Sequence, residues 1–242
     1  FNFFRGVRPL VEKFSPDKVY FVIEGYPQFR LQLDEHYKSQ RKRPDESFLK
    51  QKRAIIDLVK NHMPFITVRH AEFECDDVIA TLTAMHSRKG DECTIISSDS
   101  DFIQLHNSFD IQLYNPVKKS FIEKPDYDYV VWKSLRGDPT DNILGIKGIG
   151  DKTAHKLVRD PGMLKELFQD KKKLEIFQRN VNLIRLVDLS QRIDEMEFDY
   201  GKYSFDFLYE TFDRFEFTSM LKEKTWNKYC ATFQGLQVSG FD

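Results

Sequence analysis

The chain has 242 residues, 40% of them hydrophobic, which is enough to bury the core of one large domain or two small ones. Its formal net charge is −1, so the overall charge does not indicate a nucleic-acid partner. The distribution of charge along the chain is the better indicator of such a partner. The three cysteines, Cys75, Cys93 and Cys230, are odd in number and scattered, which argues against a disulfide framework or a zinc site and favours a reducing interior. We expect no membrane-spanning segment and no signal peptide.

The first half of the chain alternates helical and strand-like patterns. A helical period over residues 3–14 precedes a continuous apolar run, 19–23, which predicts a buried parallel strand ending at Glu24. Further along the chain the pattern predicts a helix ending near 61, a strand over 65–68, a helix from 74, a strand over 93–96, and a hairpin of 110–113 with 120–122. This order predicts an α/β fold with a mostly parallel sheet flanked by helices.

A basic segment interrupts this alternation. Residues 38–53 hold seven basic and two acidic side chains and few apolar anchors before Ala54. A solvated surface would explain such a run. The more specific interpretation is a phosphate-binding arm that is mobile without its ligand. Beside it, Tyr37 could stack on a base and Arg30 could pair with a phosphate.

Carboxylates gather at two neighbouring predicted elements. Glu74, Asp76 and Asp77 open a helix, and Asp99 and Asp101 follow the buried strand 93–96. Parallel α/β folds place ligands at the carboxyl ends of their strands, and acids that converge there repel unless cations lie between them. A cluster of oxygen ligands without His or Cys suits Mg²⁺ or Mn²⁺. The plainer alternative is that the acids serve a helix dipole and a turn.

After about Tyr127 the strand patterns stop, and the rest of the chain is expected to be helical. Residues 137–142 bring two more acids, Asp138 and Asp141. The glycine-rich run 145–150 then opens a helix, where backbone N–H groups can approach a phosphate closely. The spacing is not that of a Walker loop.

Taken together, these motifs resemble the 5′ nuclease superfamily. The segments 74–80, 98–102 and 137–143 look like three of its acidic signatures, in the family's order. Residues 148–154 look like its helix–three-turn–helix DNA clamp, and Tyr37-Lys38-Ser39-Gln40-Arg41 resembles the start of its helical arch. The likeness is greatest to flap endonucleases of tailed phages and to the 5′ nuclease domain of bacterial DNA polymerase I.

The resemblance implies a PIN-like α/β catalytic core over residues 1–132, with a basic arch near 37–53, and a helical clamp subdomain over 133–242. It implies structure-specific 5′-3′ exonuclease or flap endonuclease activity by two-metal hydrolysis, with the ions about 4 Å apart. The implied metal ligands are Glu24, Glu74, Asp76, Asp77, Asp99, Asp101, Asp138 and Asp141. The residues expected to act on the scissile phosphate are Lys38 and Arg41, with Asp99 and Asp101 at the metals. The residues expected to bind DNA are Arg30, Tyr37, Lys38, Arg41, Gly148, Gly150, Lys152, Thr153 and Lys156.

The implied cofactors are two or more Mg²⁺ ions, replaceable by Mn²⁺, with K⁺ at the clamp. The implied substrates are DNA with a 5′ flap, a nick or a free 5′ end, and RNA–DNA hybrid, acted on by a monomer in the cytoplasm of a bacterial or phage-infected cell. Family members begin with a strand that ends in a metal-binding Asp, and this strand is expected to be missing here. The missing strand keeps open the alternative of an inactive DNA-binding paralogue. A PIN-like ribonuclease, which shares an acidic α/β core, is the second alternative, and the glycine-rich clamp and the basic arch argue against it.

Overall fold

The computed structural model describes residues 1–201 and 203–240, so only three residues of the predicted clamp subdomain lie outside it. The described chain forms two compact units, each built from separate segments. The first unit comprises 1–24, 43–71 and the described part of 194–242, and the second comprises 25–42 and 72–193. None of the described helices is long and apolar enough to cross a membrane.

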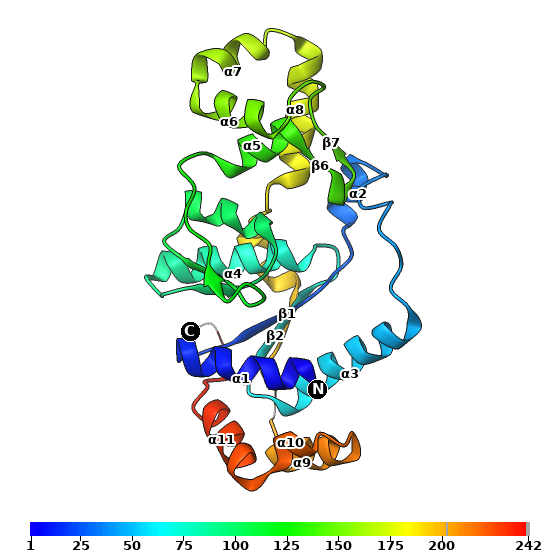
Figure 1. Cartoon of the computed structure of the whole chain (residues 1–242), viewed down its shortest axis with the longest axis vertical. Helices are drawn as coiled ribbons and strands as arrows, with labels where there is room; N and C mark the ends of the chain where they lie inside the picture. The colour runs from blue at the N-terminus through cyan, green and yellow to red at the C-terminus, as the bar shows by residue number, and fades with distance from the viewer. Residues whose placement is uncertain (202, 241–242) are drawn as a thin grey trace. The chain divides into compact units, whose positions relative to one another are not determined.

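The first unit is a three-stranded sheet covered by helices. Strand β1 (Tyr20–Ile23) runs parallel to β2 (Ile66–His70), which pairs antiparallel with β8 (Met196–Asp199). Around the sheet, α1 packs on α11 and α3 packs on α9 (Figure 1). The helices of this unit are α1 (Asn2–Phe14), α3 (Glu46–His62), α9 (Phe205–Arg214), α10 (Thr218–Leu221) and α11 (Glu223–Gln234). Aromatic side chains such as Phe4, Phe65 and Phe212 fill the core between them.

The second unit carries a smaller sheet and a group of helices. Strand β3 (Thr94–Ile96) is parallel to β4 (Gln112–Asn115), and β4 forms the predicted hairpin with β5 (Ser120–Phe121). Its helices are α2 (Gln28–Leu33), α4 (Cys75–Lys89), η1 (Ser100–Asn107), α5 (Tyr129–Arg136), η2 (Pro139–Asp141), α6 (Asp151–Arg159), α7 (Pro161–Leu167) and α8 (Lys171–Ile184), and η3 (Ser190–Glu195) begins in this unit and ends in the first. Helix α5 packs against α6 and α8 (Figure 1).

Two close backbone contacts shape the turn that carries Asp138 and Asp141. The short strands β6 (Gly137–Asp138) and β7 (Ile143–Leu144) pair antiparallel on either side of η2. Gly137 has φ +81°, and a Cβ there would lie 2.3 Å from the backbone nitrogen of Gly145. A Cβ on Gly145 would in turn lie 2.1 Å from the Arg136 carbonyl oxygen. Only glycine fits both positions, so the two acids are held on a tightly closed hairpin.

The α/β fold class is confirmed, and three expectations about its elements need correction. The sheets are mixed rather than mostly parallel, because β8 and the β6–β7 ladder add antiparallel pairs after Tyr127, where no strand was expected. Helix α3 begins at Glu46, so the second half of the arm expected to lack fixed structure is helical. Asp45 caps this helix by accepting a hydrogen bond from the Phe48 N–H at 2.7 Å, which explains its early start.

Candidate metal centre

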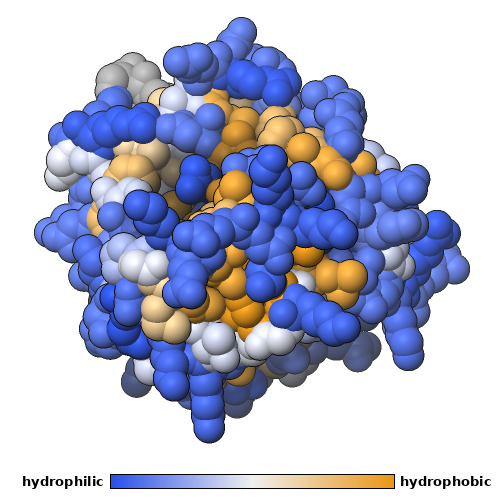
Figure 2. Space-filling view, turned by 90° about the horizontal axis from the view of Figure 1, so that it is seen from above, coloured by the Kyte–Doolittle hydropathy of each residue, from blue (hydrophilic) through white to orange (hydrophobic). Residues whose placement is uncertain are grey.

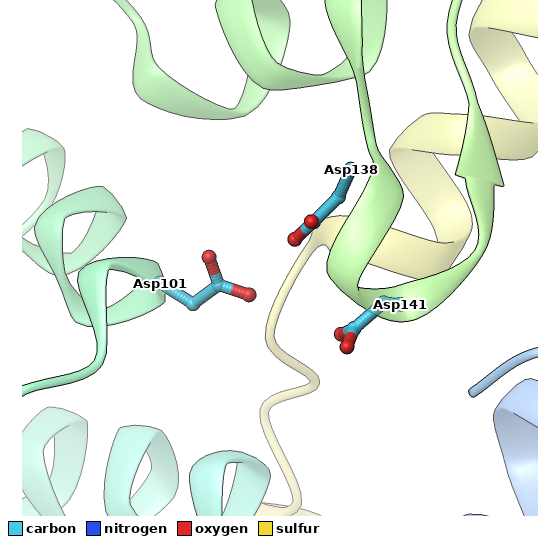
Figure 3. Close-up of side chains that lie close together, drawn as sticks. All are labelled: Asp101, Asp138 and Asp141. Atoms are coloured by element: carbon cyan, nitrogen blue, oxygen red, sulfur yellow. The ribbon is translucent and has the colours of Figure 1, made fainter. Parts of the chain in front are cut away.

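Three carboxylates of the second unit converge on one point. Asp101 in η1, Asp138 in β6 and Asp141 in η2 each offer an oxygen within 4.8 Å of the other two, and Figure 3 shows the three side chains reaching toward a shared space. Local caps hold the backbone around them. The Asp99 carboxylate accepts from the Asp101 N–H at 2.9 Å, and Asp138 accepts from the Thr140 N–H at 2.9 Å. The chain thus brings together acids separated by about 40 residues of sequence.

A buried lysine from α5 lies between two of these acids. The Lys133 ammonium group pairs with Asp101 and lies 2.6 Å from Asp138 Oδ2, while its side chain is only 4% exposed. Burial raises the pKa of Asp101 above its usual value, and Lys133 offsets this only in part. Burial also acts to raise the pKa of Asp138, yet hydrogen bonds from Lys133 and Thr140 bring it below the usual value. Lys133 was not predicted to belong to the site, although a lysine within the apolar stretch 129–135 could have indicated it.

A second group of charges surrounds Glu74 at the start of α4. The Tyr37 hydroxyl lies 3.1 Å from Glu74 Oε2 and 3.2 Å from Asp141 Oδ2. Lys38 pairs with Glu74, and Arg41 pairs with Asp141. Burial alone would lower the pKa of Lys38, but the charges of Glu74 and Asp141 raise it, so the ammonium form is favoured. Asp141 belongs to both groups and links them.

The turn that carries Lys38 is fixed to the hairpin of Asp141. The Lys38 N–H donates to the Asp141 carbonyl at 3.0 Å, and the Gln40 side chain donates to the Pro139 carbonyl at 2.8 Å. In return, the Asn142 side chain donates to the His36 carbonyl at 2.8 Å. Lys38 itself has φ +56°, a conformation that these contacts stabilise. The start of the predicted arch is therefore held in place as part of the acidic site.

Arg30 and Asp77 form a buried pair behind Glu74. Arg30 donates to both Asp77 oxygens, at 2.6 and 2.9 Å, and its Nη1 lies 2.9 Å from Glu74 Oε2. Asp77 also accepts from the Val187 N–H at 2.9 Å and is 0% exposed. These contacts correct three expectations. Arg30 and Tyr37, 3% and 6% exposed, cannot reach a phosphate or stack on a base, and Asp77 presents no accessible oxygen to an ion.

The remaining predicted ligands lie in different settings. Asp99 is exposed and caps η1, and Asp76, half-buried, is near the Cys75 thiol at 3.5 Å. Glu24 follows β1 and belongs to the first unit, so its place in a metal site remains a prediction. Among the described residues, the acids grouped closely enough to share one ion are Asp101, Asp138 and Asp141.

The predicted clamp presents a polar helix start. Gly150 caps α6, and Gly148 has φ +84°, with open space where a Cβ would lie on either residue. Lys152, Thr153 and Lys156 are exposed, while Ala154 and Leu157 on the opposite face are buried against α5. Figure 2, viewed from above Figure 1, shows mostly hydrophilic residues with a group of hydrophobic ones among them. Helix α6 therefore has one face packed against α5 and an exposed face that carries two lysines.

The fold and the site together define an α/β protein with a cluster of three carboxylates and an adjoining helical module. Residues 1–133 match the family model of the 5′-3′ exonuclease N-terminal resolvase-like domain, and residues 125–200 match that of the 5′-3′ exonuclease C-terminal SAM fold. The chain therefore belongs to the 5′-3′ exonuclease family.

Relatives of known identity agree with this membership. The thermostable DNA polymerase I of Thermus thermophilus is 32% identical over 218 residues, which cover 81% of this chain and 26% of that protein. DNA polymerase I of Deinococcus radiodurans is 35% identical over 153 residues, 58% of this chain and 15% of the other. The chain thus spans about a quarter or less of the length of these relatives.

Solved structures show the same fold. The 5′-exonuclease of bacteriophage T5 with bound zinc ions has a TM-score of 0.63 at 23% identity, covering 78% of this chain and 81% of that one. The flap endonuclease of bacteriophage T5, solved as a pseudo-enzyme–product complex with DNA and metal ions, has a TM-score of 0.63 at 21% identity, with 80% and 82% covered.

Proposed function

We propose that this chain is a structure-specific 5′ nuclease that hydrolyses DNA phosphodiesters with bound divalent cations. The observation that carries the proposal is the convergence of Asp101, Asp138 and Asp141 in a chain of the 5′-3′ exonuclease family. The same reading is supported by relatives described as DNA polymerase I and as flap endonuclease.

The donor set fits a hard divalent cation. All three grouped side chains offer carboxylate oxygen, the ligand type of Mg²⁺ and Mn²⁺, and no His or Cys belongs to the group. The protein's own cation, Lys133, pairs with Asp101 and Asp138, which supports the proposal that these acids face positive charge. Asp101, Asp138 and Asp141 would hold one ion, with Glu74, Asp76, Asp99 and Glu24 as further candidates. Two such ions activate water and stabilise the leaving oxygen when bound.

The basic side chains at the site have separable roles in this proposal. Lys38 and Arg41 are fixed next to Glu74 and Asp141, so they can neutralise a scissile phosphate brought to the carboxylates. On α6, Lys152, Thr153 and Lys156 with the N–H groups around Gly148 and Gly150 would hold the duplex backbone. Such contacts read phosphates rather than bases, so selectivity would follow DNA structure: a flap, a nick or a free 5′ end.

The finer parts of the proposal concern conditions and partners. Mg²⁺ would serve as the working ion, Mn²⁺ as its substitute and K⁺ as a ligand of the 145–150 turn. RNA–DNA hybrid would be a second substrate, and the working form would be a monomer in the cytoplasm, divided near residue 132 into catalytic core and clamp. Each of these statements can be tested separately, and the proposed nuclease activity does not depend on any of them.

The proposal is tested with a 5′-flapped DNA duplex labelled at its 5′ end. We expect cleavage with Mg²⁺ or Mn²⁺, its loss in excess chelator, and its loss in Asp138→Asn. The matched control is Asp110→Asn, which changes an exposed acid outside the site. Cleavage that persists in excess chelator would contradict the metal mechanism. Tight flap binding with no cleavage under any divalent ion would instead support the inactive DNA-binding paralogue.

A further inference from the structure

The end of α8 and the irregular segment after it, residues 183–189 and here called the strap, are held by buried side chains. Arg30, Asp77, Thr81 and Gln104 come from α2, α4 and η1 and are each at least nine-tenths buried. Arg30 donates to the strap from Nε to Leu183 O at 2.8 Å and from Nη2 to Arg185 O at 3.2 Å. The other three side chains add Gln104 Nε2 to Ile184 O at 3.2 Å, Leu186 N to Gln104 Oε1 at 2.9 Å, Val187 N to Asp77 Oδ1 at 2.9 Å, Leu189 N to Thr81 Oγ1 at 2.9 Å and Thr81 Oγ1 to Val187 O at 3.4 Å.

Arg30 differs from the other three because it also contacts the carboxylate of Glu74, whereas Gln104 reaches the acidic site only at the Asp101 backbone carbonyl, at 2.9 Å. Its guanidinium group donates four hydrogen bonds, to both Asp77 oxygens and to the carbonyl oxygens of Leu183 and Arg185, and it forms an ion pair with Glu74 Oε2. A guanidinium group is planar and rigid, so these five contacts fix the direction of each partner relative to the others. Glu74 is thereby tied to the strap through one side chain.

The consequence for Glu74 is a fixed orientation. Oε2 lies between Arg30 Nη1 at 2.9 Å and the Tyr37 hydroxyl at 3.1 Å, which leaves Oε1 to face Lys38. Because Arg30 and Asp77 form a neutral pair, Arg30 adds little net charge to the site. Its effect on Glu74 is therefore geometric: the carboxylate keeps one rotamer before any cation arrives.

We propose that Arg30 is a positioning residue that couples the strap to the acidic site and sets the orientation of Glu74 for cation binding. This inference rests on the proposed metal-dependent function. It gives Arg30 a task that differs from the phosphate contact expected from the sequence, and it links the clamp helices, through the end of α8, to the carboxylates.

Arg30→Lys separates geometry from charge. The substitution keeps the positive charge, yet a single ammonium nitrogen with three N–H donors cannot hold Asp77, Glu74 and two strap carbonyls together. The matched control is Thr81→Val, which removes the strap bonds at Val187 and Leu189 without touching Glu74. We would measure Mn²⁺ binding by titration calorimetry without DNA, the melting temperature in chelator, and single-turnover cleavage of flapped DNA.

We expect Arg30→Lys to weaken Mn²⁺ binding about tenfold, the lower end of the range for residues that orient metal ligands, and to slow cleavage more than it weakens DNA binding. Thr81→Val should lower the melting temperature while Mn²⁺ affinity stays unchanged. If Arg30→Lys does not fold, the charge-neutral pair Arg30→Met with Asp77→Leu replaces it in the same comparison.

The outcomes distinguish the two proposals. If the wild-type protein binds Mn²⁺ and cleaves, and Arg30→Lys or its replacement binds Mn²⁺ with the same affinity, the inference about Arg30 is wrong and the proposed function stands. Wild-type protein that neither binds Mn²⁺ nor cleaves overturns the proposed function and this inference with it. Equal loss of Mn²⁺ affinity in Thr81→Val would also overturn the inference, because the strap alone would then set the site.

Discussion

The acidic site is stabilised by side chains that carry the opposite charge. Carboxylates within a few ångströms of each other repel, and the sequence led us to expect cations between them, with Mg²⁺ or Mn²⁺ as the suitable ions. In the structure Lys133 pairs with Asp101 and Asp138, Lys38 pairs with Glu74, and Arg41 pairs with Asp141. The metal-free site is thus close to neutral locally, and removing one acid does not simply relieve repulsion.

Asp99 and Asp138 should therefore respond in opposite directions to the same substitution. Asp99 is exposed, and asparagine caps a helix as well as aspartate does, so Asp99→Asn should slightly raise the melting temperature in chelator. The pKa of Asp138 lies below its usual value, so its charged form is favoured in the fold, and Asp138→Asn, which removes this partner of buried Lys133, should lower stability by about 1–3 kcal/mol. Thermal melts of both variants in excess chelator test this. A rise for Asp138→Asn would mean that repulsion outweighs the Lys133 pair.

Among the helices and strands, those that a local sequence pattern determines could be predicted from the sequence. The apolar run 19–23, the hairpin around Asn115 and the glycine-led helix α6 were all expected and are all present. Strand β8 has only four residues and owes its place to pairing with β2, which no local pattern contains. The β6–β7 ladder likewise depends on the fit of Gly137 against Gly145, a contact between segments. Tertiary pairing explains both omissions.

The candidate site likewise has residues that local motifs could identify and contacts that they could not. The acids Glu74, Asp101, Asp138 and Asp141 could be named from motifs, because acid clusters at strand and helix ends are local features. Which base pairs with which acid could not be named, since Lys133 and Asp101 are joined only by the packing of α5 on η1. The burial of Arg30 and Tyr37 also depends on packing, which is why both were assigned to DNA.

The two clamp glycines offer an element-scale test with an internal control. At Gly148, φ is +84°, so any side chain strains the turn whatever the space around it, whereas Gly150 has ordinary φ and open surroundings. Gly150→Ala should keep the fold and weaken binding to all duplex sequences about equally, because the amide approach to phosphate is blocked. Gly148→Ala should lower the melting temperature as well. Binding assays on several duplexes would decide, and loss confined to one sequence would argue for base recognition.

For the whole molecule, a net charge of −1 conceals a strong separation of charge. Seven bases stand in 38–53, and the exposed first two turns of α3 carry Lys50, Lys52 and Arg53. Lys50 pairs with Glu46 at 3.0 Å on the same helix, so Lys52 is the better probe of attraction to DNA. Lys38 belongs to the same basic segment of sequence but is engaged with Glu74. A long-range and a local electrostatic role can therefore be separated with two substitutions.

Lys38→Ala should lower the single-turnover cleavage rate much more than DNA affinity, because its contact with the scissile phosphate strengthens in the transition state. Lys52→Ala should do the reverse: it should weaken binding and flatten the logarithmic salt dependence by about 0.9, the value for one lost phosphate contact. Stopped-flow cleavage and binding at several salt concentrations, on both variants, measure the two effects. Lys38→Ala also leaves Glu74 without one partner, so its melting temperature must be compared first. Should Lys38→Ala lose affinity alone, with bound DNA cleaved at the wild-type rate, Lys38 guides DNA to the site and takes no part in the reaction.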